Sequence, residues 1–305
     1  MTTNTSATDV ALAAPAFRAR WTVAVLRTAR PRQWPKNLLV FAAPLAGATL
    51  GRRDGLVYAM VAAAAFGFAS IAVYFVNDVA DAERDRRHPR KRHRPVASGE
   101  LPKQHAIVLG VGCAVAGLAA GLLIAEPLLI ATVAAYLGLS FLYSAKLKQI
   151  PVIELLFVAS GFLLRVLGGA AATHVPPSGW FLLVCSLGAL GVALAKRYSE
   201  LTSLGAEAIA HRPVMRWYRP AALRLGQIAV GAGMIAAYLA WAASEYPAEA
   251  RFWHLASALP LAAALVRFGY LTGRRTAAPV EDLLTRDGPM LACEAAWLVL
   301  FVAGL

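Results

Sequence analysis

Nine runs of apolar residues, separated by polar or charged segments, dominate this chain of 305 residues. A helix needs roughly 20 largely apolar residues to cross a bilayer. The runs lie at about 36–51, 56–79, 105–124, 127–144, 151–172, 179–196, 221–243, 252–271 and 288–305. The pattern predicts an all-α integral membrane protein with nine transmembrane helices, of which the first and the last are short.

The composition supports a membrane protein and argues against nucleic-acid binding. Hydrophobic residues make up 59% of the chain and charged residues 15%, whereas soluble domains have about 25% charged residues. The net charge of +13 would suggest nucleic acid as the partner of a soluble protein. Here the charges lie between the apolar runs, so we expect a lipid bilayer and an anionic substrate as partners, and no nucleic acid.

The distribution of Lys and Arg predicts the orientation in the membrane. With the N-terminus in the cytoplasm, 25 of the 30 basic residues fall on the cytoplasmic side and three, Arg52, Arg53 and Arg251, fall outside. This asymmetry follows the positive-inside rule. We therefore expect a multi-pass protein of the inner or plasma membrane. Residues 1–20 lack the features of a signal peptide and are expected to form a disordered tail before one membrane domain, 21–305.

Four oxygen-bearing side chains share one face at the end of the second apolar run. At about 100° per residue, Asp78, Asp81 and Asp85 all lie within about 100° of Asn77. Converging carboxylates raise one another's pKa, and a hard divalent cation relieves that repulsion. The cluster predicts a Mg²⁺ site completed by substrate phosphates, with Mn²⁺ left open. The alternative is a solvated helix end.

A basic loop follows the acidic face directly. Pro89 and Pro95 end the helix and shape the loop. Lys91 and Arg94 lie between these prolines and are expected to contact phosphate, with His88 beside them. The adjacent Arg86, Arg87 and Arg92 are assigned to membrane topology alone.

Further polar side chains cluster at the expected cytoplasmic ends of other helices. The candidates for substrate binding are Arg32, Lys36, Asn37, Tyr143, Lys146, Arg165, Lys196, Arg197, Tyr198 and Glu200. Membrane anchoring is the alternative for Arg32, and an i,i+4 ion pair is the alternative for Lys196 and Glu200. Arg165 shares a helix face with Glu154 but lies about 16 Å along the axis from it, too far for a direct pair.

These segments together resemble a known family. The acidic face and the basic loop resemble the first aspartate motif of the UbiA-type polyprenyltransferase superfamily. Their sequence is Asn77-Asp78-x-x-Asp81-x-x-x-Asp85-x-x-His88-Pro89-x-Lys91-x-x-Arg94-Pro95. Four other segments resemble the branch of decaprenyl-phosphate phosphoribosyltransferases: Arg30-x-Arg32-Gln33-Trp34-x-Lys36-Asn37, the Glu154…Arg165 helix, Trp180-Phe181-Leu182 and Lys196-Arg197-Tyr198-x-Glu200. The resemblance implies a UbiA-type bundle of nine helices around a central cavity.

The resemblance also implies a reaction. The 5-phosphoribosyl group of 5-phosphoribosyl 1-diphosphate would pass to decaprenyl (polyprenyl) phosphate, with release of diphosphate, in the synthesis of arabinan precursors for the cell wall. Asp78, Asp81, Lys91 and Arg94 would be the catalytic residues, and Asn77, Asp78, Asp81 and Asp85 the metal ligands. Prenyl chain length and homo-oligomer formation stay open.

One departure from the superfamily pattern discriminates between activities. Ordinary members have a second acidic metal motif at the end of the sixth helix, where this chain has Lys196-Arg-Tyr-Ser-Glu200. This change counts against the main alternative, an aromatic prenyltransferase that uses a polyprenyl diphosphate. A transporter or a non-catalytic scaffold would not explain an acidic cluster confined to one membrane face.

Overall fold

The computed structural model describes residues 21–89, 91–145, 150–205, 208–209, 212–274 and 280–305. All regular elements within these ranges are helices. Seven of the described helices are long and apolar enough to cross a membrane, which makes the chain a multi-pass membrane protein. The predicted tail at 1–20 and the candidate Lys146 lie outside the described residues.

The seven long helices coincide with seven of the predicted runs. They are α3 (Arg53–Arg86), α5 (Lys103–Ala120), α6 (Pro127–Ala145), α7 (Ile153–Ala172), α8 (Gly179–Leu204), α10 (Pro220–Glu245) and α11 (Ala248–Gly273). The 3-10 turn η3 (Gly121–Ile124) extends α5. The shorter elements are η2 (Lys91–His93), α4 (Pro95–Ser98), η5 (Pro213–Trp217) and α12 (Val280–Arg286).

The first and last predicted spans are shorter than a membrane crossing, so the count of nine is not confirmed. The run at 36–51 contains part of the 3-10 helix η1 (Pro31–Phe41) and the five-residue α2 (Ala42–Ala46). Pro35 lies within η1 and Pro44 within α2. Proline lacks the N–H of the α-helical ladder and clashes with the preceding turn, so a single long α-helix does not form here. The last run forms α13 (Gly288–Ala303), with 16 residues.

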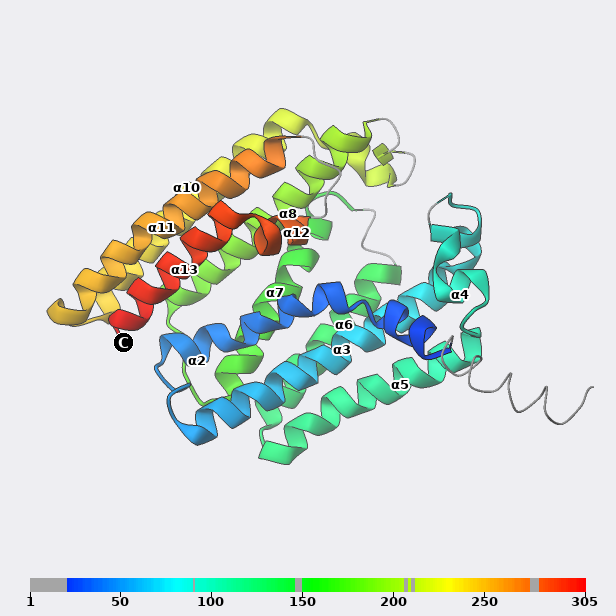
Figure 1. Cartoon of the computed structure of the whole chain (residues 1–305), viewed down its shortest axis with the longest axis horizontal. Helices are drawn as coiled ribbons and strands as arrows, with labels where there is room; N and C mark the ends of the chain where they lie inside the picture. Colours follow the sequence, from blue (N-terminus) through cyan, green and yellow to red (C-terminus); the bar gives the residue numbers. More distant parts are fainter. Residues whose placement is uncertain (1–20, 90, 146–149, 206–207, 210–211, 275–279) are drawn as a thin grey trace, which may run out of the picture. The chain divides into compact units, whose positions relative to one another are not determined.

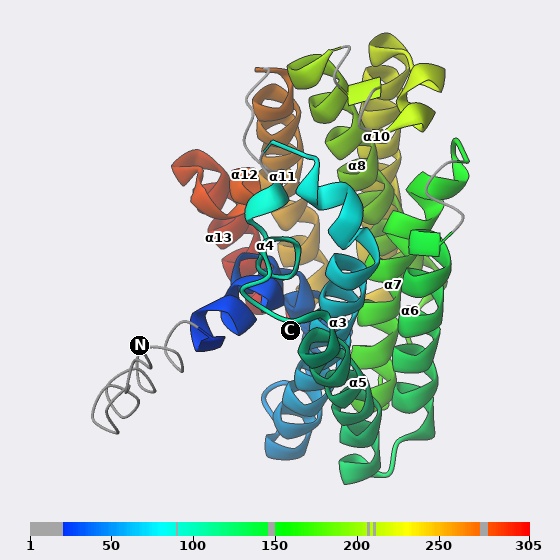
Figure 2. The same cartoon turned by 90° about the vertical axis from the view of Figure 1, so that its right-hand side faces the viewer.

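The chain divides into two compact units. The first comprises the residues up to Leu38 together with Met60–Leu137, and the second comprises Leu39–Ala59 and Gly138–Leu305. In the first unit, α3 and α5 run side by side (Figures 1 and 2), and a Cβ added at Gly117 would lie 2.9 Å from the Ala65 carbonyl oxygen. This close approach requires glycine in α5.

A short helix at 21–29 positions the loop that follows α3. Ala24 packs in one buried cluster with Phe75 and Ala82 of α3 and Val96 of α4. The Arg86 guanidinium donates to the Ala97 carbonyl at 3.1 Å. The first turn of α4 is therefore held against the C-terminal end of α3 (Figure 2).

The second unit is a layered helical assembly. Helices α8, α10, α11 and α13 lie side by side in Figure 1, and α7 packs on α8. Tyr238, Trp241 and Phe301 form a buried aromatic cluster among them. In the same unit, the backbone at Val40 approaches Gly169 of α7 so closely that a Cβ there would lie 1.8 Å from the Val40 carbonyl oxygen.

Candidate active site

The C-terminal end of α3 places two buried carboxylates on one face. The side chains of Asp78 and Asp85 are 2% and 3% exposed. One guanidinium nitrogen of Arg94 lies 3.3 Å from Asp78 Oδ1 and 2.7 Å from Asp85 Oδ2. The seven-residue spacing, two helical turns, brings the two carboxylates to a single cation. Arg30 forms a second ion pair with Asp78. We call Asp78, Asp85, Arg30 and Arg94 the carboxylate cluster.

The basic loop delivers Arg94 to this cluster. Arg94 has an extended backbone before α4, and Pro95 at the first helical position starts the helix. Gly99 ends α4 with φ +88°, a conformation that favours glycine. Arg27 donates to the His93 carbonyl at 2.8 Å and pairs with Glu100 at 2.9 Å. Local turn geometry and the 21–29 helix thus fix the residue that contacts both carboxylates.

Asp81 and Asn77 are less enclosed than the two buried carboxylates. Both are partly buried, and the Asp81 carboxylate pairs with Arg84 one turn along the helix. Across the described residues, no three His, Cys, Asp or Glu side chains are set at metal-binding distance. The geometry fits the manner in which Mg²⁺ is usually held, by one or two carboxylates together with substrate phosphates, and does not form an all-protein cage.

Arg30 was missing from the predicted set of binding residues. Its side chain contacts Asp78 and lies 5.1 Å from the centre of the Tyr74 ring. Its φ of +52° is unusual for a residue other than glycine. The residue opens the Arg30-Pro31-Arg32 segment, but the predicted set included only Arg32 of its two arginines, and Arg32 is exposed. Only the fold shows that Arg30 reaches a carboxylate 48 residues further along the chain.

Lys91 and His88 are the other predicted binding residues of the basic loop, and both lie outside the carboxylate cluster. Lys91 is half-buried, and burial together with the nearby charge of Arg94 lowers the pKa of its ammonium group. A phosphate beside Lys91 would favour its charged form. His88 Nδ1 accepts a hydrogen bond from the Lys91 backbone N–H at 3.3 Å, so His88 helps to shape the loop.

The candidates Lys36 and Asn37 lie in the middle of η1 and differ in burial. Lys36 is partly buried and donates to Gln33 Oε1 at 3.4 Å. Asn37 is buried and accepts from the Ser70 hydroxyl at 3.4 Å, and that hydroxyl also lies 3.3 Å from the Tyr136 hydroxyl. Asn37 therefore joins η1, α3 and α6 within the first unit.

The second unit contains a buried ion network. Glu154 has no solvent exposure and accepts from Arg197 Nε at 2.7 Å and from Arg212 at 2.8 Å. Arg197 also donates to Glu200 at 2.7 Å, and Arg212 donates to the Tyr143 hydroxyl at 3.1 Å. We call these five residues the glutamate–arginine network. Two glutamates balance the charge of two arginines, and Arg197 is only 2% exposed. Because its members come from different elements, the network joins α6, α7 and α8 to the segment after α8.

The remaining candidates of this unit lie around that network. Lys196 is exposed, whereas Tyr198 is partly buried and packs in the cluster that contains Leu155 and Leu223. Arg165 is buried and donates to the Gly161 carbonyl at 2.6 Å. Arg212 was not among the predicted residues, because its sequence neighbours give no sign of a partner 58 residues away.

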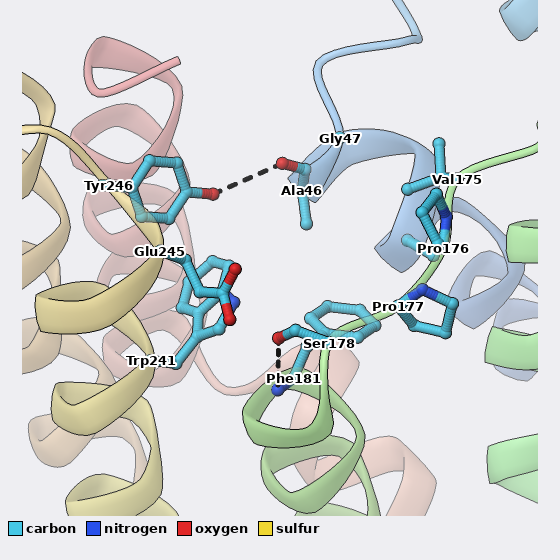
Figure 3. Close-up of a pocket in the computed structure, with 11 residues that line it drawn as sticks. Ala46, Gly47, Val175, Pro176, Pro177, Ser178, Phe181, Trp241, Glu245 and Tyr246 are labelled. Atoms are coloured by element: carbon cyan, nitrogen blue, oxygen red, sulfur yellow. Dashed lines mark hydrogen bonds between the residues drawn. The ribbon is translucent and has the colours of Figure 1, made fainter.

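A cavity of about 180 Å³ at the N-terminal end of α8 is a separate feature (Figure 3). Phe181, Trp241 and Tyr246 line it, and the Tyr246 hydroxyl donates to the Ala46 carbonyl at 3.3 Å. Among the described residues that line it, Glu245 is the one charged side chain and none is basic, so the cavity does not suit a diphosphate.

Comparisons with known proteins identify the family. The UbiA prenyltransferase family matches residues 37–284. A decaprenyl-phosphate phosphoribosyltransferase of Mycobacterium tuberculosis is 35% identical, over 90% of this chain and 91% of its own. Proteins of the same name from Mycolicibacterium smegmatis and Corynebacterium glutamicum are 32% and 30% identical, over 90% and 91% of this chain and 90% and 85% of their own.

Solved structures show the same fold. A UbiA homolog from Archaeoglobus fulgidus bound to GPP and Mg²⁺ has a TM-score of 0.69 at 17% identity, covering 92% of this chain and 99% of its own. The same homolog bound to Cd²⁺ has a TM-score of 0.66 at 17% identity, covering 92% and 98%. Sequence and fold therefore agree, and this chain belongs to the UbiA prenyltransferase family.

Proposed function

We propose that this chain transfers the 5-phosphoribosyl group of 5-phosphoribosyl 1-diphosphate to decaprenyl phosphate and releases diphosphate. Relatives with the name decaprenyl-phosphate phosphoribosyltransferase, at 30–35% identity over about nine-tenths of the chain, support this reaction. The structural observation that best supports the reaction is the convergence of the Asp78 and Asp85 carboxylates on the Arg94 guanidinium, beside a basic loop.

The last turns of α8, at 196–201, favour this donor over a prenyl diphosphate. Glu200 is its one carboxylate between Lys196 and Leu201, and Glu200 is paired with Arg197 and Arg212. Among the described residues at this end of α8, no second acidic group is available for another metal ion. An aromatic prenyltransferase, which would need that group, is therefore the weaker candidate.

A divalent metal ion is part of the proposal. The solved UbiA homolog from Archaeoglobus fulgidus is bound to Mg²⁺ in one structure and to Cd²⁺ in another. In this chain Asp78 and Asp85 would hold the ion. Asn77 is adjacent to Asp78 and Asp81 lies about one helical turn further along α3, so both are further candidate ligands. Mg²⁺ suits such oxygen ligands best. When bound, the ion would neutralise charge on the diphosphate leaving group.

The chain's own residues would position the donor and stabilise charge. Arg94 and Lys91 would donate to diphosphate oxygens as the bond from the anomeric carbon to the diphosphate breaks. An oxygen of decaprenyl phosphate would form the new bond to that carbon. This oxygen is already anionic at neutral pH, so no side chain needs to act as a strong general base.

Roles for the other predicted residues remain part of the proposal. Lys36 and Arg165 are assigned to the phosphate of the lipid acceptor. Lys196 and Tyr198 are assigned to the 5-phosphate of the donor, while Arg197 and Glu200 hold the glutamate–arginine network. The site would face the cytoplasm, where a charged, water-soluble donor can enter.

The substrate assignment is tested by offering purified protein two complete pairs of substrates. One pair is 5-phosphoribosyl 1-diphosphate with decaprenyl phosphate, and the other is a polyprenyl diphosphate with an aromatic acid. Mass spectrometry of the lipid extract should show phosphoribosyl decaprenyl phosphate from the first pair alone. Prenylated aromatic acid as the main product would contradict the proposal.

A further inference from the structure

The charges of the four side chains in the carboxylate cluster balance one another. Asp78 and Asp85 provide two negative charges, and Arg30 and Arg94 provide two positive charges. A bare divalent cation that entered this partly buried site would leave it with excess positive charge, which is costly at low effective dielectric. A metal ion that arrives with a diphosphate brings a net negative charge, since diphosphate outweighs the cation.

The two arginines are placed to exchange partners. Their side chains are 26% and 31% exposed, whereas the carboxylates that they contact are almost fully buried. Each guanidinium therefore contacts a buried carboxylate and is also partly accessible to solvent. Guanidinium groups bind phosphate oxygens as well as they bind carboxylates, with the same planar fork.

Arg30 has further features that favour such an exchange. Its left-handed backbone, with φ of +52°, holds the side chain over Asp78, and a conformation of this kind costs free energy that the fold must supply. The Cζ atom of Arg30 lies 5.1 Å from the centre of the Tyr74 ring, so the guanidinium also makes a cation–π contact that does not depend on Asp78.

We propose that Arg30 and Arg94 are exchangeable counter-ions of the metal site. They occupy the carboxylates of Asp78 and Asp85 when the site is empty of substrate. They transfer to the diphosphate when it enters with its metal ion, so that metal and diphosphate bind together and each alone binds weakly. This inference rests on the proposed function, since it assumes that Asp78 and Asp85 hold a metal–diphosphate.

The test uses equilibrium dialysis of the full-length protein in detergent with Mn²⁺ and labelled inorganic diphosphate as probes. Retention of Mn²⁺ is measured without phosphate, and retention of diphosphate is measured at saturating Mn²⁺. Arg30→Gln removes the counter-ion. Arg30→Gly does the same while suiting the left-handed backbone, so the second variant adds no backbone strain of its own.

The expected result is a pair of opposite shifts. Both Arg30 variants should retain Mn²⁺ alone about tenfold more tightly, because a competitor has been removed, and diphosphate about tenfold more weakly, because a ligand has been removed. Asp78→Asn should lose both. Arg87→Gln removes an exposed arginine at the same end of α3 and should change neither.

The outcomes separate the inference from the function beneath it. If wild type retains diphosphate in an Asp78-dependent way but the Arg30 variants do not tighten Mn²⁺ binding, the counter-ion exchange is wrong and the proposed function stands. Weakened binding of both probes by the Arg30 variants would mean a structural role and would also overturn the exchange. Absence of metal-dependent diphosphate retention in wild type would contradict both.

Discussion

At the scale of single residues, buried charge decides which side chains hold the structure. Glu154 is fully buried between Arg197 and Arg212. The pair distances of 2.7 and 2.8 Å are those of charge-assisted hydrogen bonds. Removal of one partner from such a group leaves the others buried without compensation.

Glu154→Gln is therefore expected to destabilise the protein by about 3–5 kcal/mol, because two guanidinium groups lose their shared counter-ion. The measurement is thermal unfolding in detergent, followed by tryptophan fluorescence. Glu249→Gln, at an exposed position in the first turn of α11, is the matched control and should unfold like wild type. A double variant with Arg212→Gln should lose less than the sum of the single variants; equal unfolding of Glu154→Gln and wild type would contradict the account.

The sequence indicated many of these residues but not their partners. Asp78, Asp85 and Arg94 stand close together in the chain, so helical periodicity and two prolines were enough to predict their proximity. Arg30 and Arg212 reach their carboxylates across 48 and 58 residues. Such contacts depend on how helices pack, which the local pattern does not encode.

At the scale of helices, glycine permits the closest approach in the second unit. Gly169→Ala would place a methyl group 1.8 Å from the Val40 carbonyl oxygen, so α7 and the segment at Val40 would have to separate. We expect a loss of about 1–3 kcal/mol or more. Gly138→Ala is the control, because nothing lies within 4 Å of a Cβ there. The measurement is the unfolding temperature, which should fall for Gly169→Ala and not for the control; equal temperatures would show that α7 can shift freely.

The start of α13 gives a pH-dependent prediction. The Arg267 guanidinium lowers the pKa of Asp287 below its ordinary value of 3.8. Asp287 caps α13 by accepting a hydrogen bond from the Met290 N–H, and this bond lowers the pKa further. A depressed folded-state pKa adds stability above the ordinary pKa, and this stability is lost as the pH falls through the folded value. The unfolding temperature of wild type should exceed that of Asp287→Asn at neutral pH, and the difference should shrink below pH 3.8. A difference independent of pH would contradict this assignment.

Helix positions were predictable because apolar runs of membrane length leave few alternatives. The runs predicted the seven long helices within a few residues, except where α3 and α8 continue beyond their apolar parts into charged turns. The first run is not confirmed as one long helix, because hydropathy ignores the backbone effect of Pro35 and Pro44. The sequence contained that signal, and weighting it would have predicted the short elements η1 and α2.

At the scale of the whole molecule, the charge asymmetry predicts that the carboxylate cluster faces the cytoplasm. A cysteine placed at Arg87 should react with a membrane-impermeant thiol reagent only after the cells are permeabilised. A cysteine placed at Glu245, an exposed residue between the predicted spans 221–243 and 252–271 on the side assigned to the outside, should react in intact cells. The reverse labelling pattern would contradict the orientation and would place the site away from the donor.

The central claim is that the carboxylates of Asp78 and Asp85 support phosphoribosyl transfer with a divalent metal ion. The most direct measurement follows labelled 5-phosphoribosyl 1-diphosphate into decaprenyl phosphate, with Mg²⁺ or EDTA, for wild type, Asp78→Asn, Asp85→Asn and Glu83→Gln. We expect metal-dependent label in the lipid fraction from wild type and from Glu83→Gln, which alters an exposed neighbour. Both aspartate variants should lose at least about a thousandfold in rate, or about 4 kcal/mol. Transfer at the wild-type rate by folded Asp78→Asn or Asp85→Asn, or by wild type in EDTA, would contradict the account.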